Sequence, residues 1–534
     1  MNREQELLAK MHVPASLLAL PDLFRHLLAF WQHTSLFKRK CDRTGKDVIS
    51  VFSKDCPYPV WYRDEWIKHA NPPQAEFDSN KPFWGQLWDL FQHCPLPHNV
   101  CINTENCEYT DDWWYSKNCY LSHSGFQCED VYYSYRVINC RNSFFCVFSN
   151  NCELCTDVIN STNCYNLTYG LDCSQCRDSA FLFDCRNCSD CMFCFNLRNK
   201  QYCIENKQYS KEEYEQKKQE YHFSSRKSYD QAKEHFKSLL HTQAWWRAQH
   251  LDQTENAMGD YLREVKDSSM AFFIDKGQDI VNTCRAFQVK DVVNSVGCFG
   301  SELVAYTVFL GSEGVYDIKY SVNLVDSKFM EYCMYCANCE HCFGCAGLVG
   351  KKYCILNKEY SPQEYDKKLV EIKSHLRASN EYGQLFPAYF APGAYEESLA
   401  TVYFPLSRDE QARLQFRVKK DEPYNASDYL PVSALPDDIQ AMEEKVMQKG
   451  FWDEVAKRPF TIQKFDLEHS KKQQVPLPNC FYARRINENF SWMHFDGSAR
   501  ETLCAKTGQA IMTTLPKSLD GRIVSESAYQ QILH

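Results

Sequence analysis

The chain lacks any long apolar run. No stretch of its 534 residues reaches eighteen consecutive apolar residues, and the best candidate, Ser16 to Phe24, is interrupted by Pro21 and Asp22. A membrane-spanning helix needs about 20 such residues. The amino-terminal segment also lacks the hydrophobic region of a signal peptide. We therefore expect a cytoplasmic protein with no membrane partner.

Familiar catalytic signatures are also missing. There is no phosphate-binding G-x-x-x-x-G-K-[ST], no G-x-S-x-G, no H-E-x-x-H and no dinucleotide-binding fingerprint. The sixteen histidines are scattered. A net charge of −9 argues against nucleic acid as the main partner. These absences favour a protein that is not an enzyme.

Cysteine, by contrast, is abundant, with 29 residues. All sixteen cysteines between Cys101 and Cys203 share one remainder on division by three, and the other positions in this phase are mostly small or aliphatic. Neither a helix, with period 3.6, nor a flat strand, with period 2, generates that pattern. We predict a narrow β-solenoid that turns a corner every three residues and points every third side chain at its axis.

A second period, of twelve residues, sets the length of one coil. An unbroken column of cysteines recurs at this spacing, and Asn or Gln precedes each of them. In-register strands stack like residues in this way, and internal repetition marks a solenoid. We predict about seven coils from Cys119 to Cys203, which at roughly 4.8 Å per coil make a rod roughly 34 Å long. The column contains Cys128, Cys140, Cys152, Cys164, Cys176 and Cys188.

The triplet phase returns between Ile280 and Cys333, with a slip at 311–314, and both arrays end alike: residues 199–214 match residues 350–365. This duplication predicts a mainly β protein with two tandem solenoids, helical caps over the strand edges and small α+β terminal domains. The predicted order is a helical and degenerate zinc-ribbon-like domain at 1–98, the first β-solenoid at 99–207, a helical cap or linker at 208–270, the second β-solenoid at 271–358, a helical cap or linker at 359–400, and an α+β domain with a degenerate zinc-ribbon-like segment at 401–534.

One coil of each array is filled by a C-x2-C-x2-C-x2-C run. In a reducing compartment such cysteines are buried thiols or metal ligands rather than disulfides. A thiol is small enough for a narrow axis, whereas four converging thiolates could bind zinc. We keep core packing as the first interpretation and zinc, a possible cofactor, as the second. The two runs are Cys185, Cys188, Cys191 and Cys194, and Cys336, Cys339, Cys342 and Cys345.

An aromatic column also recurs at a spacing of twelve, interrupted only by Asp157. Rings spaced by one coil could stack on sugars, bases or a protein partner. Alternatively, another part of the chain covers them, because soluble proteins seldom expose so long an apolar stripe. The candidate partner-binding residues are Tyr133, Phe145, Tyr169, Phe181 and Phe193.

Two functions follow from this layout. The first is a non-catalytic scaffold that presents solenoid faces to a protein partner or to a second copy of the chain. The second is a carbohydrate- or polymer-binding or processing solenoid, for which the candidate acids are Asp130, Asp178 and Asp190. Turn-forming Asp and Asn explain that column more simply.

Several segments at the ends of the triplet arrays and beyond them carry a family resemblance. They include Lys38-Arg-Lys-Cys, Lys81-Pro-Phe-Trp, Lys117-Asn-Cys-Tyr-Leu, the repeated Lys-x-Tyr-Cys-Ile and Cys504-Ala-Lys-Thr-Gly. Together they resemble uncharacterised cysteine-rich repeat proteins with terminal zinc-ribbon-like segments, found in small-genome candidate-phylum bacteria. The resemblance spans nearly the whole chain and implies its layout rather than an activity.

The chain departs from that family in its ribbons. Family ribbons carry close cysteine pairs, but here residues 18–25 contain no cysteine, Cys41 and Cys56 are single, and Thr507 stands where a second ligand would follow Cys504. A zinc ribbon needs four ligands, so we expect these modules to be metal-free and held by apolar packing. The ribbons are also the only hint of a third and weaker function, zinc-dependent association with nucleic acid.

Overall fold

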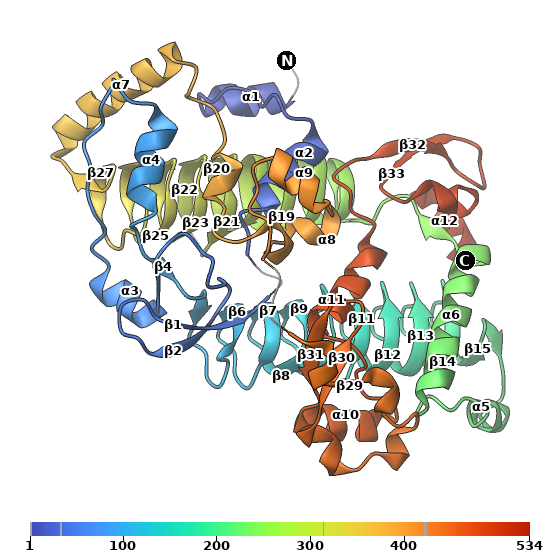
Figure 1. The fold of residues 1–534 in the computed structure, drawn as a ribbon. Coiled ribbons are helices and arrows are strands. Elements are labelled where there is room, and N and C mark those ends of the chain that lie inside the picture. Colours follow the sequence, from blue (N-terminus) through green and yellow to red (C-terminus); the bar gives the residue numbers. More distant parts are fainter. Residues whose placement is uncertain (1–2, 33–34, 313, 421–423, 534) are drawn as a thin grey trace.

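Two β-solenoids lie side by side and form the centre of the molecule (Figure 1). The computed structural model describes residues 3–32, 35–312, 314–420 and 424–533. Apart from the last strand of each solenoid, which pairs antiparallel, neighbouring strands are parallel, and most partners are twelve residues apart: Leu167 lies opposite Ser179, and Cys191 opposite Cys203. The predicted fold, mainly β with twelve-residue coils, is confirmed.

The strands are short and follow one another around each coil. The first solenoid contains β5 (Cys101–Ile102), β6 (Tyr109–Trp114), β7 (Tyr120–Phe126), β8 (Glu129–Tyr132), β9 (Tyr135–Ile138), β10 (Arg141–Phe144), β11 (Thr156–Ile159), β12 (Tyr165–Leu171), β13 (Arg177–Phe183), β14 (Ser189–Phe195), β15 (Gln201–Ile204) and β16 (Lys207–Gln208). The second contains β18 (Leu251–Asp252), β19 (Glu255–Phe299), which follows several coils, β20 (Ser301–Ala305), β21 (Val308–Gly311), β22 (Val315–Lys319), β23 (Val322–Val325), β24 (Lys328–Glu331), β25 (Met334–Ala337), β26 (Glu340–Phe343), β27 (Lys352–Ile355) and β28 (Lys358–Glu359).

The two solenoids run in opposite directions. Arg285 of the second donates to the Tyr135 hydroxyl of the first at 2.6 Å, and Arg136 donates to the Phe273 carbonyl at 3.2 Å. Further along, His250 faces Asp172. Residue numbers therefore rise along the first solenoid while they fall along the second, so each end of one lies beside the opposite end of the other.

Each coil is built from four three-residue units. The residue before each inward-pointing one adopts the left-handed conformation, as in one coil at Gln127, Asp130, Tyr133 and Arg136, whose φ values are 53°, 54°, 53° and 50°. Asn and Asp tolerate this region better than other side chains with a Cβ. The amide column and the Asp130, Asp178 and Asp190 column are both rows of such corners.

The inward thiols and hydroxyls also form hydrogen bonds along the axis. The Ser143 hydroxyl donates at 2.7 Å to the carbonyls of Arg141, in its own coil, and Cys152, in the next. The Cys140 thiol donates in the same pattern to Ile138 and Ser149, at 3.5 Å in both cases. Small polar groups therefore fill the axis and add hydrogen bonds to carbonyls that also accept backbone N–H groups, as the Cys152 carbonyl does from Arg141.

Helices and terminal segments cover the apolar faces of the solenoids. The amino-terminal helices α1 and α2 contact β19, α6 contacts β13 and β14, α7 contacts β27, and α11 contacts β11 (Figure 1). None of the described helices has both the length and the apolar content needed to span a membrane. The helices are α1 (Arg3–Lys10), α2 (Leu20–Leu28), α3 (Arg63–His69), α4 (Phe83–Phe91), α5 (Lys211–Lys218), α6 (Arg226–Thr242), α7 (Pro362–Ala378), α8 (Ala400–Tyr403), α9 (Arg408–Arg413), α10 (Lys464–Gln473), α11 (Tyr482–Phe490) and α12 (Glu526–Leu533).

One face of each solenoid remains open, and it is polar. Across neighbouring coils of the first, Lys117 pairs with Glu129 at 2.7 Å. In the second, Lys290 pairs with Glu302 at 3.1 Å and Lys352 with Glu340 at 2.6 Å. Such cross-strand pairs stabilise a sheet weakly, and they keep this face solvated.

The second solenoid begins earlier than the sequence suggested. The helical stretch expected over 208–270 ends at Thr242, and strands of the solenoid start at Leu251. Leu262, Val265 and Ala271 already occupy inward positions in the triplet phase and are buried. The charged residues around them obscured that phase. The slip at 311–314 is a coil of fourteen residues, since Val304 lies opposite Ile318; Glu313 lies outside the described residues.

Two hairpins near the chain ends share one local geometry. They are β1 (Phe37–Lys40) with β2 (Asp47–Ser50), and β32 (Arg500–Leu503) with β33 (Ala510–Thr513). The Cys41 sulfur accepts the Tyr62 N–H at 3.2 Å, and the Cys504 sulfur accepts the Ser525 N–H at 3.3 Å. Each ribbon-like cysteine is thus held by the segment that follows its hairpin.

Other short strands join the terminal segments to the rest of the molecule. Trp246 pairs with Ile523, so the linker before the second solenoid is tied to the carboxyl-terminal segment. These strands are β3 (Val60–Trp61), β4 (Leu96–Pro97), β17 (Trp246–Arg247), β29 (Leu430–Pro431), β30 (Gly450–Asp453), β31 (Arg458–Thr461) and β34 (Ile523–Val524).

Candidate functional site between the solenoids

A groove of about 360 Å³ separates part of the first solenoid from the start of the second. We call it the inter-solenoid groove. One wall is a row of corner residues one coil apart, and the other comes from the linker and first coils of the second solenoid. Its main side chains are Arg136, Phe148, Asn160, Asp172 and Asp184 on the first wall, and Arg247, His250, Tyr261 and Phe273 on the second.

Three buried carboxylates lie at this groove. Asp172 and Asp184 line it from left-handed corners of consecutive coils, and Asp260 sits behind it at the start of β19. Their side chains are 6 %, 6 % and 5 % exposed. Charges buried so deeply are costly unless they are paired, so the partners of each decide what it can do.

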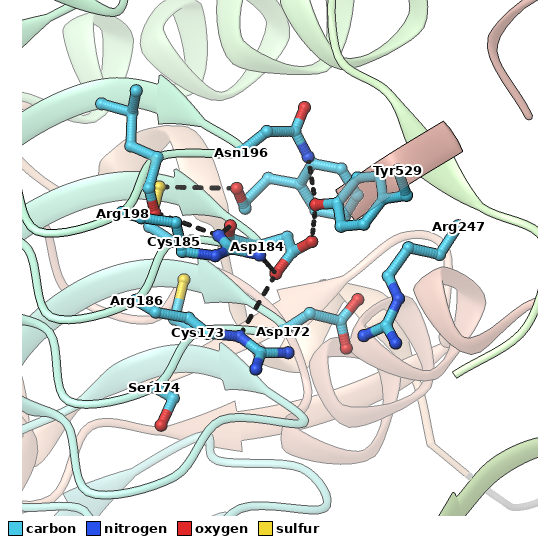
Figure 2. Close-up of polar contacts among 12 residues, drawn as sticks. Asp172, Cys173, Ser174, Asp184, Cys185, Arg186, Asn196, Arg198, Arg247 and Tyr529 are labelled. Carbon is cyan, nitrogen blue, oxygen red and sulfur yellow. Dashed lines mark hydrogen bonds and ion pairs between the residues drawn. The ribbon is translucent and has the colours of Figure 1, made fainter. Parts of the chain in front are cut away.

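Both carboxylate oxygens of Asp184 accept hydrogen bonds from other residues of the protein. One oxygen accepts a hydrogen bond from Arg198 at 3.0 Å, and the other accepts one from the Tyr529 hydroxyl (Figure 2). Asn196 in turn donates to the Tyr529 oxygen at 2.8 Å. This cluster therefore anchors α12 to the first solenoid, and Asp184 has a structural role.

His250 lies between the other two carboxylates. Its Nδ1 is 2.9 Å from Asp260 Oδ1, its Nε2 is 3.7 Å from Asp172 Oδ2, and its ring stacks on Tyr261 with centroids 4.3 Å apart. Burial lowers the pKa of His250, but the charges of Asp260 and Asp172 outweigh burial, and the pKa is raised above its ordinary value. The imidazolium form is thus favoured.

Asp172 is only half engaged. Asn160 donates to its Oδ1 at 2.5 Å, while its Oδ2 accepts no hydrogen bond from the residues that the structure describes. Figure 2 shows the Arg247 guanidinium on the side of Asp172, with no bond between them. Burial raises the pKa of Asp172, and the His250 charge opposes this effect. The Oδ2 atom is therefore a buried acceptor that a ligand O–H or N–H could satisfy.

The predicted partner-binding column does not lie on an open face. Tyr133, Phe145, Tyr169, Phe181 and Phe193 are all buried, at 6 % exposure or less. The carboxyl-terminal segment and α6 cover them. They form an interface within the chain, so the proposed partner surface is corrected to an internal contact. An apolar column looks the same in sequence whether its cover comes from the same chain or from another.

The two cysteine runs lie on the solenoid axes. All eight thiols are buried, and all but Cys188 donate to carbonyls of the next coil, as Cys185 does to Cys194 at 3.6 Å and Cys336 to Cys345 at 3.8 Å. Burial raises the pKa of both Cys185 and Cys336. Among the described residues, no group of three or more His, Cys, Asp or Glu is arranged to hold a metal ion. The geometry gives these thiols a packing and hydrogen-bonding role.

The predicted acidic column lies away from the groove. Asp178 Oδ1 accepts a hydrogen bond from Asn166 at 2.8 Å, as expected of stacked corner residues. Sequence reasoning missed Asp172, Asp184, His250 and Asp260. One signal was available, since Asn160, Asp172, Asp184 and Asn196 form a polar column directly beside an apolar one.

Comparison with known proteins gives no further identification. The chain matches no protein-family model, and no curated protein matches it.

Proposed function

We propose that the protein is a non-catalytic binding scaffold whose two solenoids form the walls of a ligand site, and that the ligand is polyhydroxylated, as an oligosaccharide is. The inter-solenoid groove would hold it. The observation that carries this proposal is the Oδ2 atom of Asp172, a buried acceptor with no donor among the described residues. Hydroxyl groups are donors that fit such an atom.

The other groups in the groove suit the same ligand. Tyr261 and Phe273 line the groove and stack with centroids 5.3 Å apart, and Tyr261 is partly exposed whereas Phe273 is buried. Asn150, Thr162 and Ser174 line the groove at intervals of one coil. A few placed polar groups beside aromatic rings are typical of small-molecule sites, and a row of amide and hydroxyl groups suits a ligand made of repeated units.

Two features favour binding over hydrolysis. A glycosidase ordinarily uses a pair of carboxyl groups on either side of the scissile bond. Here Asp184 is engaged by Arg198 and Tyr529, and Asp260 by His250 and Thr514. Asp172 is the buried acid of the groove lining whose carboxylate has an oxygen with no hydrogen-bond donor among the described residues, although the His250 ring lies 3.7 Å from that oxygen, so binding is the better proposal.

The chain offers a matched pair of variants for the test. Asp172 and Asp178 are both solenoid corners that accept a hydrogen bond from an Asn one coil earlier, but only Asp172 lines the groove. In Asp172→Asn the remaining oxygen can still accept from Asn160, while an NH₂ group replaces the free acceptor. Asp178→Asn makes the same chemical change outside the groove.

The measurement is a screen of soluble oligosaccharides followed by calorimetric titration of the best ligand. We expect Asp172→Asn to weaken binding at least tenfold and Asp178→Asn to leave it unchanged. If no oligosaccharide binds the wild-type protein, or if the two variants bind equally well, the proposal is wrong. Release of shorter oligosaccharides by the wild type, lost in Asp172→Asn, would replace binding with hydrolysis.

A further inference from the structure

A second and larger cavity, of about 710 Å³, lies on another side of the first solenoid. We call it the aromatic cavity. The first coils of the solenoid, the β1–β2 hairpin and the segment from β31 to the start of α11 form its walls. Its aromatic side chains include Tyr109, Tyr120, Tyr133, Phe460 and Phe481. Its size falls within the usual range for small-molecule sites.

Asp466, at the start of α10, supplies a buried acid to this cavity. Its Oδ2 accepts the Gln463 N–H at 2.8 Å and the Tyr133 hydroxyl at 3.0 Å. Its Oδ1 is buried and has no hydrogen-bond partner among the described residues, although Asp466 is only 2 % exposed. Burial raises the pKa of Asp466 to about 7. A buried polar atom without a partner requires an explanation, and a ligand in the cavity provides one.

Cationic side chains also line the cavity. Lys38 on β1 and Lys54 after β2 are exposed, and no carboxylate in the described part of the chain forms a salt bridge with either. Lys420, in contrast, is paired with Asp55 at 2.6 Å. Two uncommitted ammonium groups therefore accompany one uncommitted, deeply buried carboxyl oxygen.

We propose that the aromatic cavity binds a nucleoside diphosphate, with the base between the aromatic walls, an N–H of the base edge on Asp466 Oδ1 and the diphosphate on Lys38 and Lys54. Bases stack on aromatic side chains regardless of their identity, and base edges carry the N–H donors that a carboxylate accepts. Lysine binds phosphate as a point charge. The anionic part of the ligand would lie with the lysines rather than with the acid.

The test uses the full-length protein and calorimetric titration with ADP and UDP, then with adenosine, uridine and inorganic diphosphate alone. We expect at least one nucleotide to bind tenfold more tightly than its nucleoside and than diphosphate. The double variant Lys38→Gln/Lys54→Gln should weaken nucleotide binding at least tenfold. Its control is Lys40→Gln, because Lys40 is exposed on the same strand but pairs with Asp47 and does not line the cavity.

Asp466→Asn tests the base contact. An Asn can keep its oxygen on Gln463 and Tyr133, which places an NH₂ donor where the free acceptor was, so binding of both nucleotide and nucleoside should weaken. Tyr133→Phe leaves Oδ1 unchanged and should retain binding. The proposal is overturned if neither ADP nor UDP binds at millimolar concentration, if diphosphate alone binds as tightly, or if Lys40→Gln weakens binding as much as the double variant does. The Lys38→Gln/Lys54→Gln result stands even if Asp466→Asn fails to fold.

Discussion

Asp157 and Arg485 form a two-bond ion pair at the one interruption of the aromatic column. Arg485 donates through Nε to Asp157 Oδ1 at 2.9 Å and through Nη2 to Oδ2 at 2.7 Å. The Asp157 side chain is fully buried, and the same guanidinium lies 3.7 Å from the centre of the Phe145 ring. The aspartate that breaks the column therefore fixes the helix, α11, that covers it.

Replacing Asp157 with Asn should destabilise the protein by about 3–5 kcal/mol at pH 7, because removing one partner of a buried pair leaves the other charge uncompensated. Urea denaturation measures this change. The control Asp178→Asn removes a corner carboxylate without an ion pair and should change stability by less than about 0.5 kcal/mol. A loss below about 1 kcal/mol in Asp157→Asn would contradict the structural role of the pair.

The same pair predicts an acid-sensitive contribution to stability. Burial alone would raise the pKa of Asp157, but the charges of Arg485 and Lys233 outweigh it and hold the pKa well below its usual value. A depressed folded-state pKa contributes stability that is present above the unfolded value of about 3.9 and is lost as the pH falls towards the folded value. The stability gap between wild type and Asp157→Asn should therefore narrow below about pH 4.

The hydroxyls on the solenoid axis should contribute more to the free energy of unfolding than their small size suggests. Ser134 donates to the Tyr132 carbonyl at 3.0 Å and accepts the Cys146 N–H, one coil later, at 3.1 Å. Ser134→Ala leaves the buried Cys146 N–H without its acceptor, while the Tyr132 carbonyl still accepts the Phe145 N–H, and should cost about 1–3 kcal/mol in urea denaturation. Ser189→Ala, on the open face, should be nearly neutral. Equal losses of stability in the two variants would mean that the hydroxyls on the axis stabilise the solenoid through packing alone.

The solenoid itself was predictable because its constraint is local. Each coil must place a small side chain on the axis at every third residue. Positions such as Cys128, Val131 and Ser134 meet this requirement whatever packs against the outside of the solenoid. The capping boxes that begin α5 at Ser210 and α7 at Ser361 are local in the same way, because a cap involves only neighbouring residues.

The groove was not predictable from the same pattern. Asp172 and His250 are separated by the whole α5–α6 cap, and they meet only because the second solenoid folds back antiparallel to the first. Nothing in a triplet phase specifies that docking. For the same reason the sequence alone leaves Phe181 as a candidate for partner binding, although α6 covers this residue in the structure. A periodic pattern defines which residues face outward, and long-range packing decides what they meet.

Gly297 should be required for docking of the amino-terminal domain. Its φ is 68°, and a Cβ there would lie 2.4 Å from Cζ3 of Trp31, which follows α2. Gly297→Ala should therefore destabilise the protein by about 1–3 kcal/mol through overpacking, in addition to backbone strain. Gly350→Ala is the matched control, because its φ is 65° but no atom lies within 4 Å of the added methyl group. If both variants lose the same stability, strain alone explains the effect.

His250 should make stability depend on pH near neutrality. Burial and the nearby Arg247 lower the pKa of His250, but Asp260 and Asp172 outweigh them and raise it above the unfolded value of about 6.5. A raised folded-state pKa contributes stability that is fully present below about pH 6.5 and is lost as the pH rises through the folded value.

Thermal unfolding of wild type and His250→Gln should therefore differ more at pH 6 than at pH 9. His98→Gln is the control with the opposite sign, because burial lowers the pKa of His98 to about 4, so its stability gap from wild type should be larger at pH 9 than at pH 6. A gap between wild type and His250→Gln that stays constant from pH 6 to pH 9 would mean that folding does not shift the pKa of the imidazole between the two carboxylates.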